Sequence, residues 1–566
     1  MVQSSFIDAL NSSMAVPVPP LSEISHAHPV AYFCAEFGFD TNVPIYAGGL
    51  GILAGDTLKQ SADANFPMVG VGLLSRGFGM RQHITPTGEQ IDQDWFFDPR
   101  SVGLENVYLD DQPLFVKVHL TEVVVWLRCW KKTFANGVVL YLLDSETDQN
   151  QLPERSLTQV LYCGTKELQL KQQLLLGIGG VKLLTKLGIH PAVYHVQEGR
   201  PAFLHWQLIR ELMDTHKIEY ESARRLAIEK TVYTNHTLVA AGNQSYSIDL
   251  LKVLAGYYAE KMHISVDELL KQGIDTDPAQ FSVTRFALNI ARKASGVSTL
   301  HSKLSQEQWP EYTWTNITNG VHFPTWQATS IAATQNTPHD LWQSHLQEKQ
   351  NLAQFVLSHT GYTFNPNWFV ITWARRLAGY KQMEMLFSDI QRLAEIVKRV
   401  DRPVQILVAG KAHQGDVQGK QLLKKIITYM QNELSGHALF VPNYNLSVAQ
   451  ALVRGSDLWL NTPIHGQEAC GTSGMKAAAN GVVQCTVPDG WAAEVDWSDK
   501  GWALTPNFTA ENLYDLLEKE IIPTFYDRNH EDRPEKWIEM MQKTIDLSKQ
   551  YTAERMLNEY QSKLYR

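Results

Sequence analysis

The sequence is poor in cysteine, has no long apolar run and carries no excess of positive charge. Its five cysteines among 566 residues never stand in a CxxC spacing, which excludes a disulfide scaffold and a zinc ribbon and indicates a reducing compartment. No stretch of about 18 apolar residues occurs and no signal sequence is recognisable, so we expect a cytoplasmic protein that does not bind membranes. A net charge of −9 provides no positive electrostatic field that would attract nucleic acid. His26 and His28 alone do not predict a metal site.

The chain has enough apolar material for large cores, since 44% of its residues are hydrophobic and 19% are charged. At roughly 150 residues per domain, the length predicts two to three large α/β domains or about four smaller ones. The stretch around Pro17, Pro19 and Pro20 is rich in serine and proline without periodicity, and we expect a loosely held arm there.

The first half of the chain alternates helical and strand patterns. Helical patterns cover residues 166–176 and 181–187, with Gly188 as a stop, and a buried strand is expected at 193–196. Leucines recur at i, i+4 and i+8 in a further helix over 204–212. The order of helix, strand and helix predicts parallel α/β layers.

The second half has short apolar runs separated by amphipathic helices, one of them with an apolar stripe from Leu386 to Val397. The runs that predict strands are 368–373, 404–409, 438–441, 457–460 and 482–487. This βαβαβ order predicts a doubly wound parallel sheet. We therefore expect an α/β protein with two Rossmann-like lobes that face a cleft, residues 1–320 and 321–566, with the final helices packing back on the first lobe.

A glycine-rich segment, Gly48–Ala54, is a candidate site. It formally matches a dinucleotide fingerprint, but no convincing strand precedes it and no acidic residue lies about 20 residues further on. Two alternatives remain. The segment either binds a phosphate or phosphosugar at the start of a helix over 52–62, or it forms a tight structural turn.

A second glycine loop begins at Gly471 and enters an alanine-rich helix, with Ser473 as the expected N-cap. The free N–H groups at such a helix start suit a phosphate. Lys476 would lie in the first turn, where the helix dipole and an apolar wall would lower its pKa, as Schiff-base formation requires. The combination suggests pyridoxal 5′-phosphate, although a lysine taken alone is more often a solvated surface residue.

Basic and polar residues follow other predicted strands. Arg376 and Lys381 come after the strand at 368–373 and could clamp a dianion from two sides, the alternative being an ordinary basic loop. His236 also ends a strand, and Glu468 precedes the second glycine loop. By default these two would be a core or turn histidine and a solvated carboxylate.

With these residues in view, the chain resembles the α-glucan phosphorylases, and particularly their short bacterial and archaeal branch, from about residue 31 to residue 497. Eight ordered motifs carry the resemblance: AYFCAEFGFD from Ala31, IYAGGLGILAGD from Ile45, LGIGGVKLL from Leu176, YTNHT from Tyr233, ITNGVHFPTW from Ile317, WARRLAGYKQ from Trp373, AGKAH from Ala409 and EACGTSGMKAAANG from Glu468. The family consists of retaining GT-B glycosyltransferases that carry pyridoxal phosphate. The resemblance implies reversible phosphorolysis of a terminal α-1,4-glucosyl unit of glycogen or maltodextrin by inorganic phosphate, which yields glucose 1-phosphate.

The resemblance also implies roles for matching residues. Lys476 matches the lysine that bears the cofactor, while Gly471 and Thr472 match the backbone that holds its phosphate. Arg376 and Lys381 match the pair that binds the substrate phosphate. The positions that match substrate-binding residues are Gly48, Gly49, Leu50, Glu198, Arg200, His236, Asn319, Tyr380 and Glu468. We expect Lys476, Arg376, Lys381 and His236 to be catalytic.

Several positions depart from the family pattern, and two of them bear on function. Arg200 stands where the family usually has a histidine near the acceptor sugar, and Asn445 stands where long members have an arginine for the cofactor phosphate. Two other functions therefore stay open. One is a GT-B transferase that uses a nucleotide sugar and no pyridoxal phosphate, and the other is a catalytically silent glucan-binding or regulatory protein. Assembly into a homodimer is also left open.

Overall fold

The computed structural model describes residues 22–77, 81–162, 164–239 and 242–566. The segment with Pro17, Pro19 and Pro20 and one of the five cysteines, Cys163, lie outside the described residues. The other four cysteines are buried and free. None of the described helices is long and apolar enough to span a membrane.

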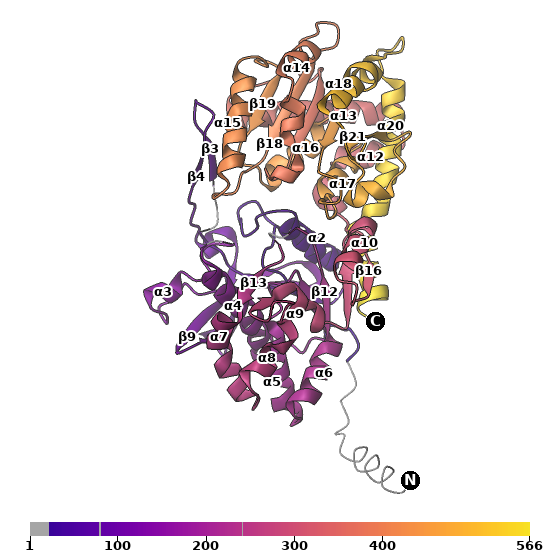
Figure 1. The fold of residues 1–566 in the computed structure, drawn as a ribbon. Helices are drawn as coiled ribbons and strands as arrows, with labels where there is room; N and C mark the ends of the chain where they lie inside the picture. Colours follow the sequence, from indigo (N-terminus) through magenta and orange to yellow (C-terminus); the bar gives the residue numbers. More distant parts are fainter. Residues whose placement is uncertain (1–21, 78–80, 163, 240–241) are drawn as a thin grey trace.

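Two open sheets form the centres of two lobes, which lie one above the other in Figure 1. The first half of the chain builds the lower lobe and the second half builds the upper lobe. This arrangement confirms the predicted α/β fold with two doubly wound lobes. A division of the chain at residue 320 remains our proposal.

The lower sheet has ten strands, and its central strands are parallel. Across the sheet the order is β16 (Trp314–Asn316), β15 (Lys293–Gly296), β12 (Thr231–Thr234), β11 (Val193–Gln197), β1 (Val30–Phe33), β2 (Met68–Leu73), β10 (Val139–Asp144), β9 (Val123–Thr133) and β5 (Glu105–Asn106), with β8 (Phe115–Leu120) also paired to β9. In β1, Val30 and Tyr32 face one apolar core, whereas Ala31 and Phe33 face the other. Helices therefore cover both faces of the sheet.

One helix, α4 (Lys166–Lys186), replaces the two helices that the sequence predicts over residues 166–187. The glycines between residues 177 and 180 suggest an interruption of the helix, but they lie inside it and allow neighbouring segments to pack closely. A Cβ on Gly177 would lie 2.3 Å from the backbone N of Leu204, at the start of α5 (Leu204–His216), and one on Gly180 would lie 2.3 Å from the ring of Phe33. The predicted stop at Gly188 is confirmed, since its φ is +68°.

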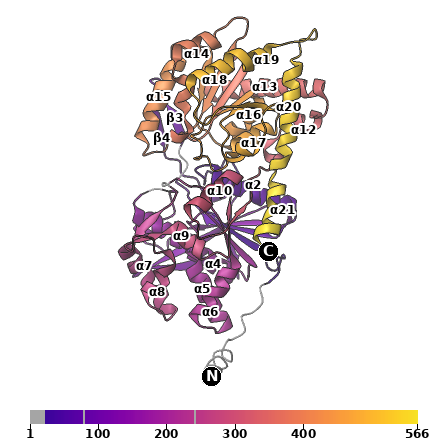
Figure 2. The ribbon, with the colours of Figure 1, turned by 45° about the vertical axis from the view of Figure 1, so that its right-hand side comes forward.

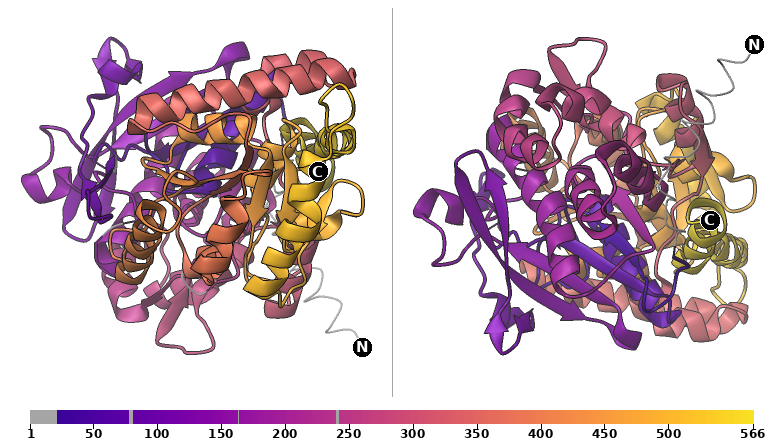
Figure 3. Two further views of the ribbon diagram at one scale, coloured as in Figure 1. Left: turned by 90° about the horizontal axis from the view of Figure 1, so that it is seen from above. Right: turned by 90° about the horizontal axis from the view of Figure 1, so that it is seen from below.

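The upper sheet has six parallel strands, and helices lie on both of its faces (Figure 3). Their order is β19 (Ala438–Val441), β18 (Val404–Ala409), β17 (Phe369–Ala374), β20 (Leu458–Asn461), β21 (Val483–Thr486) and β22 (Gly501–Ala503). Five of these strands confirm the predicted runs to within about a residue. The predicted helix from Leu386 begins later, as α14 (Ile390–Val397), because Asp389 caps it by accepting the Arg392 N–H.

The chain returns to the lower lobe at its end, as Figure 2 shows. Helix α20 (Glu535–Ser548) packs on the upper lobe, and α21 (Ala553–Glu559) contacts α2 (Gly49–Asp63) of the lower lobe. Tyr565 then lies in the apolar core beside β1. The lobes are therefore joined by two crossings of the chain.

A hairpin of the lower half of the chain, β3 (Arg81–Ile84) and β4 (Gln90–Gln93), reaches the upper lobe beside α15 (Val417–Gln431) (Figure 1). Gln82 donates to the carbonyl of Gly410 at 2.8 Å, and Gln90 donates to that of Ala412 at 3.0 Å. Both glutamines are buried. The hairpin thus supports the loop that follows β18.

A buried charge cluster ties α13 (Pro338–Thr360) to the upper sheet. Asp457, directly before β20, accepts from Lys349 at 2.6 Å and from the backbone N–H of Val370 at 2.7 Å, and it lies 2.8 Å from His345 Nε2. Lys349 and Asp457 are 0% exposed. An unpaired charge at this depth would be strongly destabilising.

We predict that Lys349→Met lowers the free energy of unfolding by about 3–5 kcal/mol, because it leaves the Asp457 carboxylate without its cation. Urea titration of the full chain, followed by tryptophan fluorescence, measures the change. Lys398→Met, at an exposed position with no ion pair among the described residues, is the matched control and should change stability by less than about 0.5 kcal/mol. Equal urea midpoints for the two variants would contradict the assigned role.

Candidate functional site

The first glycine loop opens α2 as predicted, with Gly48 as the N-cap and Leu50 half-buried in the first turn. Nothing lies within 4 Å of where a Cβ would stand on Gly48 or Gly49, so the backbone is open on that side. As the first helical residue, Gly49 has an N–H without an intrahelical acceptor. The buried Glu36 holds the loop by accepting the N–H groups of Ala47 at 2.6 Å and Gly48 at 3.1 Å.

The second glycine loop differs from the prediction in its cap. Gly471, at φ +83°, is the N-cap of α17 (Thr472–Ala478), so the prediction of Ser473 as N-cap is wrong. The left-handed conformation of the glycine turns the chain into the helix without a side-chain cap. Lys476 consequently lies in the last turn of this short helix rather than in the first.

Lys476 is buried against the indole of Trp326, at the end of α11 (Phe323–Trp326), with Nζ 4.2 Å from the ring centroid. The pKa of Lys476 is lowered to about 8, which confirms the predicted direction. Burial is the largest cause, as the predicted apolar wall implies, whereas the predicted dipole contribution is wrong because Lys476 does not lie in the first turn; the carboxylate of Asp56 partly opposes the shift. Asp56 accepts from the Trp326 indole at 2.8 Å, and its Oδ1 has no partner in the part of the chain that is described.

The loop after β17 carries the predicted basic pair, and the two side chains lie differently. Arg376 is exposed and makes no hydrogen bond or ion pair within the described ranges, whereas Lys381 forms a buried ion pair with Glu468. Tyr380 lies beside Lys381, with its ring centroid 4.6 Å from Nζ. The structure thus brings together Lys381 and Glu468, two residues that the sequence assigns to phosphate and to sugar.

The neighbouring Arg375, which sequence analysis did not select, is buried. It donates to the carbonyl of Leu460 at 2.8 Å, and its Nε has no partner among the described residues. Burial lowers the pKa of its guanidinium. Only the burial, which depends on the upper sheet, distinguishes Arg375 from Arg376.

In the lower lobe, His236 and Glu198 adjoin each other after β12 and β11. Glu198 accepts the backbone N–H of His236 at 2.9 Å, and burial raises the pKa of Glu198 to about 8. Its φ of +59° is unusual for a residue with a side chain. Arg200 lies over the ring of Tyr162 at 4.1 Å, and the Tyr162 hydroxyl donates to Glu36 at 2.8 Å.

The remaining predicted positions lie where the lobes meet. The Oδ1 of Asn319 is buried without a partner among the described residues, so it is available to a ligand. The backbone N–H of Asn319 donates to the carbonyl of Val297 at 3.0 Å, and Ser298, the residue after Val297, donates to the carbonyl of Ala469, just before the second glycine loop, at 2.7 Å. Asn445 caps α16 (Leu446–Gly455) by accepting the Val448 N–H at 3.0 Å, which explains an asparagine there as a structural residue.

An apolar cluster joins the glycine-loop helix to the lysine helix. Ile52 of α2 shares this cluster with Trp326, with Met475 beside the lysine, and with Trp491. The helix that the first glycine loop opens and the helix that carries Lys476 therefore pack against one shared core.

These residues fit pyridoxal 5′-phosphate. An aldehyde needs an amine that is partly neutral near pH 7, and the buried Lys476 meets this need. A phosphate needs donors, and the N–H groups of Thr472 and Ser473 have no acceptor among the described residues. The side chain of Trp491 limits the space beside the helix, since a Cβ on Gly474 would lie 3.0 Å from its ring.

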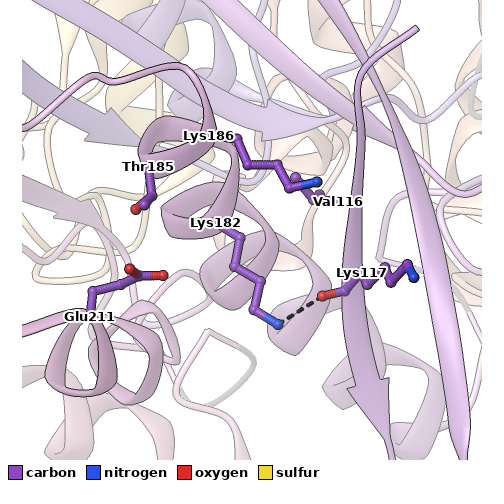
Figure 4. Close-up of a pocket in the computed structure, with 6 residues that line it drawn as sticks. All are labelled: Val116, Lys117, Lys182, Thr185, Lys186 and Glu211. Atoms are coloured by element: carbon purple, nitrogen blue, oxygen red, sulfur yellow. Dashed lines mark hydrogen bonds between the residues drawn. The ribbon is translucent and has the colours of Figure 1, made fainter. Parts of the chain in front are cut away.

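A surface hollow of about 360 Å³ lies elsewhere, between α4 and β8 (Figure 4). Its lining residues are Val116, Lys117, Lys182, Thr185, Lys186 and Glu211. Lys182 donates to the carbonyl of Lys117 at 2.8 Å. None of the predicted site residues lines this hollow.

Comparison with known proteins finds similarity over both lobes. Residues 326–531 match the family model described as carbohydrate phosphorylase. The chain is 33% identical to the maltodextrin phosphorylase of Thermococcus litoralis over 95% of this chain and 70% of that protein. It is 31% identical to the glycogen phosphorylase of Aquifex aeolicus over 96% of this chain and 87% of that protein. An uncharacterized protein of Methanocaldococcus jannaschii is 29% identical over 95% of this chain and 100% of its own length.

We predict that Asp56→Asn lowers the pKa of Lys476 further, by about one pH unit or more, because the carboxylate favours the ammonium form. The pH dependence of acetic anhydride labelling at Lys476, followed by mass spectrometry after hydroxylamine treatment, measures the pKa. Asp63→Asn is the matched control, since Asp63 lies on the same helix and contacts His322 instead. A labelling midpoint that stays in place or rises in Asp56→Asn would disprove the coupling.

Proposed function

The chain belongs to the carbohydrate phosphorylase family, and we propose that it is an α-1,4-glucan phosphorylase that uses pyridoxal 5′-phosphate. The proposed reaction transfers a terminal glucosyl unit of glycogen or maltodextrin reversibly to inorganic phosphate, with retention of configuration, and yields glucose 1-phosphate. The buried amine of Lys476, with its pKa lowered to about 8, is the observation that carries the proposal. It distinguishes this site from one in which a solvated lysine binds a nucleotide diphosphate.

We assign the cofactor to the second glycine loop. Lys476 would bind the aldehyde, and the loop backbone at Gly471 and Thr472, with the N–H groups of Thr472 and Ser473, would hold the phosphate. When bound, the cofactor supplies a phosphate group that can hold and pass on a proton. The indole of Trp326 keeps water from the amine, because it covers Nζ at 4.2 Å.

The substrate phosphate would bind between the two loops. Arg376 is free to turn toward an anion, and Lys381 needs only to exchange part of its ion pair with Glu468. The N–H of Gly49 and the positive end of α2 would complete the site from the lower lobe. Two phosphates side by side need such a set of cations and N–H groups.

The glucosyl unit would lie between His236 and Asn319, with Glu468 and Tyr380 on the side of the upper lobe. Glu198 has a pKa of about 8, so it is largely protonated near neutral pH and can donate a hydrogen bond without adding negative charge. Phosphate replaces water as the nucleophile, and a pair of carboxylates of the kind that glycosidases use is not required. Arg200 would border the acceptor side, and Gly48 and Leu50, which flank Gly49, would bind substrate with it. The homodimer and the cytoplasmic location stay predictions.

We expect borohydride reduction of the purified protein to leave a pyridoxyl adduct on Lys476, and Lys476→Ala to abolish both the adduct and the release of glucose 1-phosphate from maltodextrin. Mass spectrometry of the tryptic peptides and a coupled assay measure the two effects. Lys398→Ala, with an exposed lysine, is the control and should keep both. Release of glucose 1-phosphate without an adduct would contradict the assigned cofactor, the absence of both would favour the nucleotide-sugar transferase, and an adduct without activity would favour a silent homologue.

Arg376→Ala should lower kcat/KM for inorganic phosphate about 10²- to 10³-fold, because one charge-assisted contact to the reacting anion is lost. Initial rates at varied phosphate and saturating maltodextrin test this. Arg399→Ala removes an exposed arginine that pairs with Asp401, and its rates should match those of the unmodified protein. An unchanged kcat/KM for inorganic phosphate in Arg376→Ala would show that Arg376 does not bind the substrate phosphate.

A further inference from the structure

A buried chain of hydrogen bonds ends at His236. The Nε2 atom of His236 lies 2.7 Å from Oε1 of Gln197, and Nε2 of Gln197 lies 2.7 Å from Nε2 of His195. The Nδ1 atom of His195 lies 3.0 Å from the hydroxyl of Tyr565. Gln197 and His195 are both 0% exposed, so no water competes for these contacts.

The donors and acceptors in this chain can be assigned from the amide of Gln197. In the structure the Gln197 oxygen faces Nε2 of His236, and because an amide oxygen only accepts, this amide orientation requires the proton on Nε2. The same orientation points the amide nitrogen at His195 Nε2 as a donor, so Nδ1 of His195 donates to Tyr565. The Thr234 hydroxyl, also 2.7 Å from His195 Nε2, can donate to Ser295 at 2.8 Å. Burial lowers the pKa of His236 to about 3 and that of His195 well below its usual range, so both rings are neutral. Each ring therefore has one donor and one acceptor nitrogen.

We propose that Gln197 is a positioning residue that holds His236 in the tautomer protonated at Nε2, so that Nδ1 is presented to the bound sugar as a hydrogen-bond acceptor. Nδ1 of His236 makes no hydrogen bond to any described residue. An acceptor at that place binds a sugar hydroxyl that donates, and the opposite tautomer would present a donor instead. That the ligand at His236 is a sugar rests on the proposed function, whereas the position of the proton on His236 does not.

The position of Gln197 in the fold supports this role. It is the last residue of β11, and Thr234 at the end of the paired strand β12 lies two residues before His236. Thr234 Oγ1 also lies 2.7 Å from His195 Nε2, so the ring of His195 is held from two strands. Tyr565 comes from the segment that returns to the lower lobe, and its ring stacks with Tyr560 at 5.9 Å. The ring of His195, which the Gln197 amide contacts, is therefore positioned from the side opposite to His236.

The first experiment measures the tautomer in the full chain labelled with 15N-histidine. The His236 resonances, assigned from their loss in His236→Gln, should show the proton on Nε2. Gln197→Leu should move the proton to Nδ1 or mix the two forms, and Gln197→Glu, whose carboxylate also accepts, should keep it on Nε2. Gln405→Leu is the matched control, because Gln405 is likewise a fully buried strand residue, located in β18. A proton on Nδ1 in the unmodified protein, or no change in Gln197→Leu, would overturn the proposal.

The second experiment reads the effect on sugar recognition. Monodeoxy analogues of glucose 1-phosphate identify the hydroxyl that His236 contacts. It is the hydroxyl whose removal lowers kcat/KM less in His236→Ala than in the unmodified protein. Gln197→Leu should reduce discrimination at that hydroxyl about tenfold and leave the other positions unchanged, while Gln405→Leu should change none. Discrimination that is unaltered in Gln197→Leu counts against the proposal. A tautomer shift in a protein without phosphorolysis would leave the role of Gln197 intact and refute the proposed function instead.

Discussion

Burial of the Lys476 amine where the lobes meet is the constraint on which the site depends. Three contributions act on it at once: the loss of water, the indole face of Trp326 and the carboxylate of Asp56. Burial disfavours the ammonium and Asp56 favours it, so the pKa stays near neutral pH instead of falling much further. Because Asp56 lies on the helix that the glycine loop opens, the same residue connects the chemistry of one lobe to the backbone of the other.

The opposing effects of burial and Asp56 on the pKa of Lys476 require the two lobes to keep a fixed relative position. Several parts of the chain hold the lobes in that position. The hairpin of β3 and β4 attaches to the loop after β18 through two buried glutamines. Helix α21 returns to α2, and the cluster that contains Ile52 and Met475 fills the junction. None of these contacts touches the reacting groups. Their common effect is to bring loops from separate sheets to one place and to keep water from it.

The lower lobe prepares its side of the site mainly with neutral groups. Glu198, with its raised pKa, and the neutral ring of His236 act as donors and acceptors rather than as charges. The charges of the upper lobe, Lys381 and Glu468, neutralise each other. Under the proposed function, an incoming phosphate would take the place of Glu468 beside Lys381, because a cation can exchange one anionic partner for another.

The sequence by itself determined the two α/β lobes, the strands of the second half and the two glycine loops, because strand and helix periodicity and turn residues are local properties. It did not identify Asp56 or Gln197 as partners of site residues. It also missed Glu36, which holds the first glycine loop, although a lone carboxylate in the apolar run AYFCAEFGF was a detectable signal. Only the tertiary structure decided that Arg375 is buried and Arg376 exposed, that Gly471 caps α17 in place of Ser473, and that Trp326 and Asp56 are the residues that surround the Lys476 amine. These properties depend on contacts between residues far apart in the chain, such as Asp56 with Trp326, and no local pattern encodes such contacts.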